Sequence, residues 1–220
     1  DAQTVTRSAA ATLEILAEQT TLSGRVVSTL DQTPLEGVTV SIGAVSGRTD
    51  ASGRFFLVNP PSGEQIMILD GATTTNPPGV YHTLPIKVTI IANTSNGLSY
   101  TPHLVPVDTS VFSVINPAQE SVIEDPRIPG FKLTIPAGVT LVSDFDGSPI
   151  TQVAITPVPP DRLPVPPPPP GAFHLDPATV YLLYFFKPGG AIPSQPIPVA
   201  APNDVGADPG GRVLFFFYDS

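Results

Sequence analysis

Residues 34–58 read PLEGVTVSIGAVSGRTDASGRFFLV and decide the fold class. Within this stretch, residues 38–42 alternate strictly between apolar and small polar side chains, as expected of a β-strand with one buried face. Asp50, Ser52 and Gly53 are typical of a tight turn, because they tolerate the backbone conformations that a turn requires. Residues 54–58 are rich in apolar, β-favouring side chains, so they are expected to pair with residues 46–50 as a β-hairpin.

Strand-like runs separated by turns continue on both sides of this stretch. Turn-forming residues recur about every ten residues, and the β-branched runs between them are typical of an all-β sandwich. Residues 71–79 are expected to form a loop. The strands expected in this part of the chain are residues 22–28, 38–42, 54–58, 65–69 and 86–92.

The composition supports a β-rich chain with a core and excludes several classes of protein. The 29 prolines among 220 residues argue against a mostly helical protein, because each proline inside a helix removes a hydrogen bond and costs about 3 kcal/mol. Hydrophobic residues make up 41% of the chain, which is enough for a core. The net charge is −9 and the basic residues are spaced singly, so no basic surface for nucleic acid is expected. No apolar run approaches the ~18 residues of a membrane span.

The sequence predicts two β-sandwich-type domains preceded by a strand-like arm. The arm covers residues 1–21, without Gly or Pro, and the first sandwich covers residues 22–108. A connector, residues 109–128, leads to a proline-rich β-domain at residues 129–220. Prolines 166–170 are expected to form a stiff polyproline II segment that serves as a rigid loop or covers a sheet edge.

The arm alternates between apolar and polar side chains, which favours a β-strand. Helix propensity favours instead a short helix through residues 9–19, with Ser8 as its N-cap. A strand-like arm can add to a sheet of a neighbouring subunit as a donor strand, or dock on its own domain. Six apolar arm residues are candidates for a subunit interface: Val5, Ala9, Ala11, Leu13, Ile15 and Ala17.

Two strands near the C-terminus, residues 180–186 and 213–218, are apolar on both faces. Such strands need cover on both sides, either from the proline-rich loops or from a neighbouring subunit. Phe185, Phe215 and Phe217 are therefore further candidates for a subunit interface.

The sequence contains few candidates for catalytic, metal-binding or modified residues. His82, His103 and His174 lack metal-ligand spacing and are expected to be solvated loop residues. Asp144 and Asp146 precede Gly147 as at the start of a calcium loop, but the further ligands of such a loop are missing and a turn explains them. No nucleophile elbow, phosphate-binding loop or cysteine is present, so no catalytic residue, metal or cofactor is expected. Asn93 begins an Asn-Thr-Ser sequon and is a candidate glycosylation site.

Three segments of the first sandwich resemble the carboxypeptidase-regulatory-like family. Residues 24–26 match its G-x-V element, residues 34–40 its P-L-x-G-V-x-V strand, and residues 49–55 its T-D-x-x-G-x-F hairpin. The resemblance implies a small prealbumin-like sandwich that serves as an accessory, spacer or assembly module. It implies no catalytic residues.

The second half resembles the β-rich segment upstream of the repeats in large bacterial RHS-repeat surface and secreted proteins. The shared order includes I-P-A-G at residues 135–138, P-V-P at 157–159, P-G-G-A at 188–191 and P-I-P-V at 196–199. This resemblance implies a module of a larger surface or toxin protein, although no RHS repeat follows in the chain.

Together these features predict a non-enzymatic structural protein that self-assembles, with the arm donating a strand to build a filament. A surface of Ser, Thr, Pro and Gly with few charges predicts an extracellular or cell-surface location, with a signal peptide removed. The expected partners are copies of the same chain and glycans, with no nucleic acid and no membrane span.

The alternative to a self-assembling structural protein is a monomeric spacer or adhesin module of an RHS-like protein. A third hypothesis, carbohydrate binding by a sandwich face, depends on Tyr81, Tyr100 or the C-terminal aromatic residues.

Overall fold

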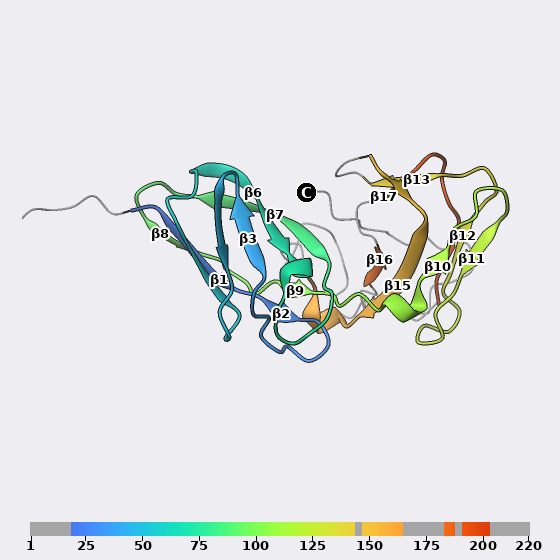
Figure 1. The fold of residues 1–220 in the computed structure, drawn as a ribbon, viewed down its shortest axis with the longest axis horizontal. Coiled ribbons are helices and arrows are strands. Elements are labelled where there is room, and N and C mark those ends of the chain that lie inside the picture. The colour runs from blue at the N-terminus through green and yellow to red at the C-terminus, as the bar shows by residue number, and fades with distance from the viewer. Residues whose placement is uncertain (1–18, 144–146, 165–182, 188–190, 203–220) are drawn as a thin grey trace, which may run out of the picture.

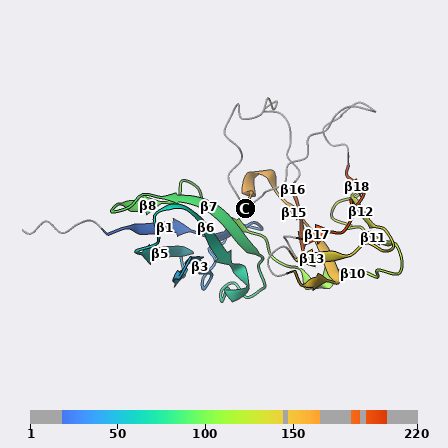
Figure 2. The same ribbon diagram turned by 90° about the horizontal axis from the view of Figure 1, so that it is seen from above.

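The computed structural model describes residues 19–143, 147–164, 183–187 and 191–202. Within these residues the regular elements are β-strands and three short 3₁₀ turns, and no α-helix occurs among them. The prediction of an all-β protein is therefore confirmed. Figures 1 and 2 show two β-rich halves at opposite ends of the longest axis.

The first half contains two sheets that face each other and a short two-stranded parallel sheet, β2-β9. One sheet has the order β4-β3-β6-β7 and is antiparallel throughout. The other has the order β5-β1-β8, in which β1 pairs antiparallel with β5 and parallel with β8. The elements are β1 (Thr21–Arg25), β2 (Val27–Ser28), β3 (Thr39–Ile42), β4 (Val45–Arg48), β5 (Arg54–Val58), β6 (Gly63–Asp70), η1 (Gly71–Thr73), β7 (Thr83–Ile90), β8 (Ser95–Gly97) and β9 (His103–Leu104).

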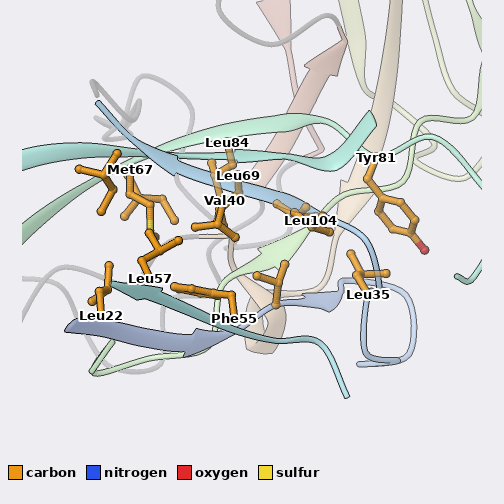
Figure 3. Close-up of a cluster of buried hydrophobic side chains, with 14 of the residues drawn as sticks. Leu22, Leu35, Val40, Phe55, Leu57, Met67, Leu69, Tyr81, Leu84 and Leu104 are labelled. Carbon is orange, nitrogen blue, oxygen red and sulfur yellow. The ribbon is translucent and has the colours of Figure 1, made fainter. Parts of the chain in front are cut away.

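The core of this half lies between the two sheets, as Figure 3 shows. Side chains alternate between inward and outward along each strand, and this decides which of them enter the core. In β5, Phe55 and Leu57 are buried while Arg54, Phe56 and Val58 face outward. In β6, Met67 and Leu69 are buried while Ile66 and Ile68 face outward. The first half is thus a β-sandwich with two separate outer faces.

The turn at residues 50–53 forms as expected, but its two flanking strands do not pair with each other. The amide of Asp50 donates to the carbonyl of Arg54 at 2.8 Å, and the Asp50 side chain accepts from the amides of Ser52 and Arg54 at 2.8 and 2.9 Å. β4 pairs with β3 in one sheet, whereas β5 pairs with β1 in the other. The predicted hairpin of residues 46–58 is therefore wrong. The turn instead carries the chain from one sheet to the other, so that both strands reach the same core from opposite sides.

The second half contains three small sheets around a core of its own. Their orders are β10-β15-β16, β11-β12-β18 and β14-β13-β17. The stretch expected as a connector, residues 109–128, contains β10 and β11 and supplies Ile115, Ile123 and Ile128 to this core. The elements are η2 (Thr109–Val111), β10 (Ser113–Val114), β11 (Ser121–Ile123), β12 (Lys132–Ile135), β13 (Leu141–Ser143), β14 (Pro149–Ile150), β15 (Gln152–Val158), η3 (Pro160–Arg162), β16 (Leu183–Lys187), β17 (Ala191–Pro193) and β18 (Val199–Ala200).

Candidate functional site

Most residues predicted for a subunit interface lie outside the described part of the chain. Phe185 belongs to β16, where it pairs with Thr156 of β15 in an antiparallel register. Asp144 and Asp146, suggested for calcium, also lie outside the described residues, as does His174. The interface residues outside the described part are Val5, Ala9, Ala11, Leu13, Ile15, Ala17, Phe215 and Phe217.

The point at which the arm joins the first sandwich is described in detail. β1 is the central strand of its sheet, and Thr20 directly precedes it. The Thr20 carbonyl accepts from the amide of Asn59 at 2.8 Å, and its hydroxyl accepts from the amide of Asn93 at 2.8 Å. Asn59 and Asn93 both have positive φ, at 55° and 56°, which asparagine tolerates better than most residues. Two loops therefore fix the chain where it enters β1, at the end of the first half that points away from the second half (Figures 1 and 2).

The loop that carries the sequon is held by its own side chains. Asn93 is exposed, and the hydroxyl of Thr94 donates to the carbonyl of Ile91 at 2.9 Å. The Asn96 side chain donates to the carbonyls of Thr21 and Ile91, both at 3.0 Å, and so joins the loop to β1. Asn93 is thus accessible on an ordered loop, and its glycosylation stays a prediction.

The outer faces of the first sandwich carry large exposed apolar side chains. Phe56 and Val58 on β5 are 59% and 44% exposed, and Ile66 and Ile68 on β6 are 41% and 36% exposed. The two pairs lie on opposite faces of the sandwich, because β5 and β6 belong to its two different sheets. Exposed apolar side chains grouped on a flat sheet are typical of surfaces that bind another protein. Sequence reasoning missed them, because FFLV and IMIL are apolar throughout and do not show which residues face outward.

Two histidines expected in solvated loops are in fact partly or fully buried. His82 is buried, and its Nδ1 accepts from the amide of Val105 at 2.9 Å, which joins the segment before β7 to the segment after β9. His103 is half-buried in β9, and burial is the main cause that lowers its pKa. Both residues therefore have structural positions in the first half. The prediction that they are solvated is wrong, because these loops pack against one another.

The two tyrosines proposed for carbohydrate stacking are not on an open face, and the C-terminal aromatic residues lie outside the described part of the chain. Tyr81 is 5% exposed and belongs to the core, where Figure 3 shows it, and Tyr100 is half-buried against the same core. Stacking on a sugar requires an accessible ring, so the proposal that Tyr81 binds carbohydrate is wrong.

Arg162 of η3 connects the second half to the first. Its Nη1 donates to the carbonyl of Thr29 at 3.1 Å and also to the carbonyl of Leu30. Asp161 lies beside it, with 3.6 Å between the Arg162 Nε and an Asp161 carboxylate oxygen. Arg162 therefore ties η3 to the loop that follows β2.

A second arginine orders the start of the second half. Arg127 forks onto the buried carboxylate of Asp125, with Nε 2.9 Å from Oδ1 and Nη2 2.5 Å from Oδ2. Its Nη2 also donates to the carbonyl of Ile155 in β15 at 3.0 Å. Hydrogen bonds from Arg127 hold the pKa of Asp125 below its usual range. The fork therefore joins residues 125–127 to the central strand of a sheet.

Among the described residues, no three His, Cys, Asp or Glu side chains are grouped as metal ligands. In the same part of the chain no helix has the length and apolar character needed to cross a membrane. The resemblances to the carboxypeptidase-regulatory-like and RHS-associated families stay predictions, since no family model and no curated protein matches the chain.

Proposed function

We propose that the chain is a non-enzymatic structural protein of the cell surface or extracellular space, whose copies assemble through the N-terminal arm. In this proposal, residues 1–18 of one copy add as a strand to a sheet of the next copy. Such a contact joins different surfaces on the two copies, so its repetition does not close and builds a filament.

The observation that carries the proposal is the anchored start of β1. Thr20 is held by Asn59 and Asn93 on either side of the central strand. A strand formed by the residues before Thr20 would continue the direction of β1 beyond its own sheet, where a neighbouring copy can supply partner strands. The alternating pattern of the arm provides the apolar face that such a strand needs.

The first test compares the full chain with a chain that begins at Gln19, by negative-stain electron microscopy and size exclusion. The truncation leaves Thr20 and all of β1 in place, so the sandwich should fold. We expect fibres from the full chain and monomers from the truncated chain. Fibres from the truncated chain would contradict the role of the arm, and monomers from the full chain would contradict self-assembly.

Two single substitutions distinguish a strand from a helix in the assembled arm. A strand places Ile15 on the same side as Leu13 and places Leu16 on the opposite side. A helix groups Leu13 with Leu16 and turns Ile15 away. If the arm is donated as a strand, Ile15→Ser should weaken assembly more than Leu16→Ser does. The reverse order would show that the arm docks as a helix.

A spacer or adhesin module of a larger RHS-like surface protein is the second candidate function. It is favoured by the hydrogen bonds from Arg162 to Thr29 and Leu30, because a spacer requires a fixed orientation of its parts. A monomer in solution, together with a reading frame that runs past Ser220 into repeats, would support this function over the filament.

A further inference from the structure

We propose that the two outer faces of the first sandwich bind each other between neighbouring copies: the β5-β1-β8 face of one copy packs on the β4-β3-β6-β7 face of the next. This inference rests on the proposed self-assembly. It adds a second contact between copies, besides that of the arm, and the residues that make it lie in the described part of the chain.

Apolar side chains provide the area for this contact. Phe56 and Val58 stand out from β5, and their partners across β1 are the small residues Ser23 and Thr21. On the other face, Ile68 of β6 lies between Ser41 and Pro85. Each face therefore presents two large apolar side chains, and those of the first face stand among small neighbours, which lets a second sheet approach closely. Sheets that pack face to face lie about 10 Å apart with their strands within about 30° of each other.

The first face also carries an unbalanced positive charge. Arg25 and Arg54 are both exposed and lie directly opposite each other in the register of β1 and β5. Neither makes an ion pair with a carboxylate among the described residues. Like charges directly opposite each other destabilise a sheet, so a partner that brings a carboxylate to this point gains binding energy. In a chain with a net charge of −9, a second copy is such a partner.

The second face presents a carboxylate in the matching position. Glu64 is exposed on β6, two residues before Ile66 and four before Ile68. Arg54 has the same spacing from Phe56 and Val58 on β5. If β5 of one copy runs parallel to β6 of the next, Arg54 meets Glu64, Phe56 meets Ile66 and Val58 meets Ile68.

Charge also opposes one symmetric alternative. Two β5-β1-β8 faces packed with their strands running in the same direction would bring four arginines together, and like-charge contacts at an interface are strongly unfavourable. Because the two unlike faces lie on opposite sides of one sandwich, the contact between them repeats without closing and extends a filament.

Charge reversal in the full-length chain tests this contact, with the critical concentration for assembly as the measurement. Arg54→Glu and Glu64→Arg should each raise it by about tenfold, because each places like charges together. The double variant should restore it to within about twofold, since the pair re-forms with reversed signs. Glu120→Arg is the matched control: Glu120 is exposed in the second half, makes no ion pair among the described residues, and should leave assembly unchanged.

Phe56→Ser tests the apolar part of the contact, with Val114→Ser as the control at an exposed apolar position of the second half. Melting temperatures verify that all variants fold. Assembly of both charge variants at the wild-type concentration would overturn the face-to-face contact but leave self-assembly intact. A double variant that assembles no better than the single ones would also overturn it. A wild-type chain that never assembles would instead overturn the proposed function itself.

Discussion

Gly53 shows how one residue joins the two sheets of the first sandwich. Its φ is +71°, and a Cβ placed on it would lie 2.4 Å from the carbonyl oxygen of Val26. Any other residue would therefore combine an unfavourable backbone conformation with a collision against backbone that cannot move away easily. The turn at residues 50–53 requires glycine at this point.

Gly53→Ala should lower the free energy of unfolding by about 3 kcal/mol, from left-handed strain and steric collision together. Gly63→Ala is the matched control, because Gly63 has a φ of +88° and a Cβ added there would meet no atom within 4 Å. It should cost only the backbone strain, about 1 kcal/mol. Urea denaturation of both variants measures the difference, and equal losses would contradict the close approach to Val26.

The fork between Arg127 and Asp125 makes stability depend on pH. Because Arg127 holds the pKa of Asp125 below its usual range, the ionised carboxylate stabilises the fold. That stabilisation is fully present above the unfolded-state pKa of about 3.9 and is lost as the pH falls through the lower folded-state value. We therefore expect Asp125→Asn to be less stable than the wild type at pH 7, and the two proteins to converge in stability towards pH 2, as urea denaturation across this pH range would measure.

The variant Arg127→Lys tests how much the two parallel hydrogen bonds between Arg127 and Asp125 contribute to stability. Lysine keeps the charge but cannot make two parallel hydrogen bonds to a carboxylate. We expect a loss of about 2 kcal/mol at pH 7, a moderate value because Arg127 is 41% exposed and solvent screens the pair. Denaturation curves at pH 7 measure this loss, and an unchanged midpoint would show that charge alone is sufficient.

At the scale of single elements, alternation predicts strands well and their partners poorly. Residues 38–42 alternate cleanly, and β3 occupies residues 39–42 with Val40 and Ile42 buried. Residues 54–58 also form a strand, but its pairing with β1 rather than β4 depends on contacts between distant residues. The pattern of a strand is local, whereas its partner is decided by how both sheets close over the core.

The strands within residues 109–128 could not be predicted from the sequence, for a different reason. β10 has two residues and β11 has three, which is too short for a period of two to be visible. Their strand character comes from pairing with β15 and β12.

The exposed residues of the proposed contact could not be predicted from the sequence either. The run Arg54–Val58 contains four consecutive apolar residues, so only the structure shows that Phe55 and Leu57 face the core and Phe56 and Val58 face outward.

At the scale of the whole molecule, the two halves have separate cores. Polar contacts between described residues hold the two halves together. Every buried residue of the first core precedes Val105, and every buried residue of the second follows Asp108. The hydrogen bonds from Arg162 to the carbonyls of Thr29 and Leu30 cross between these halves. Both hydrogen bonds come from Nη1, whose two N–H groups can serve the two backbone carbonyls together.

Arg162→Ala should therefore release the two halves from a fixed orientation without unfolding either. We expect small-angle X-ray scattering to show a larger radius of gyration, and thermal unfolding to separate into two transitions, since cores that are no longer coupled melt independently. Glu120→Ala is the control, because Glu120 is an exposed charged residue of the second half without an ion pair among the described residues. If Arg162→Ala and Glu120→Ala give the same scattering curve as the wild type, Arg162 does not fix the orientation. If only Arg162→Ala changes the curve and the proposed filament also loses its regularity, a fixed angle between the halves is part of how copies pack.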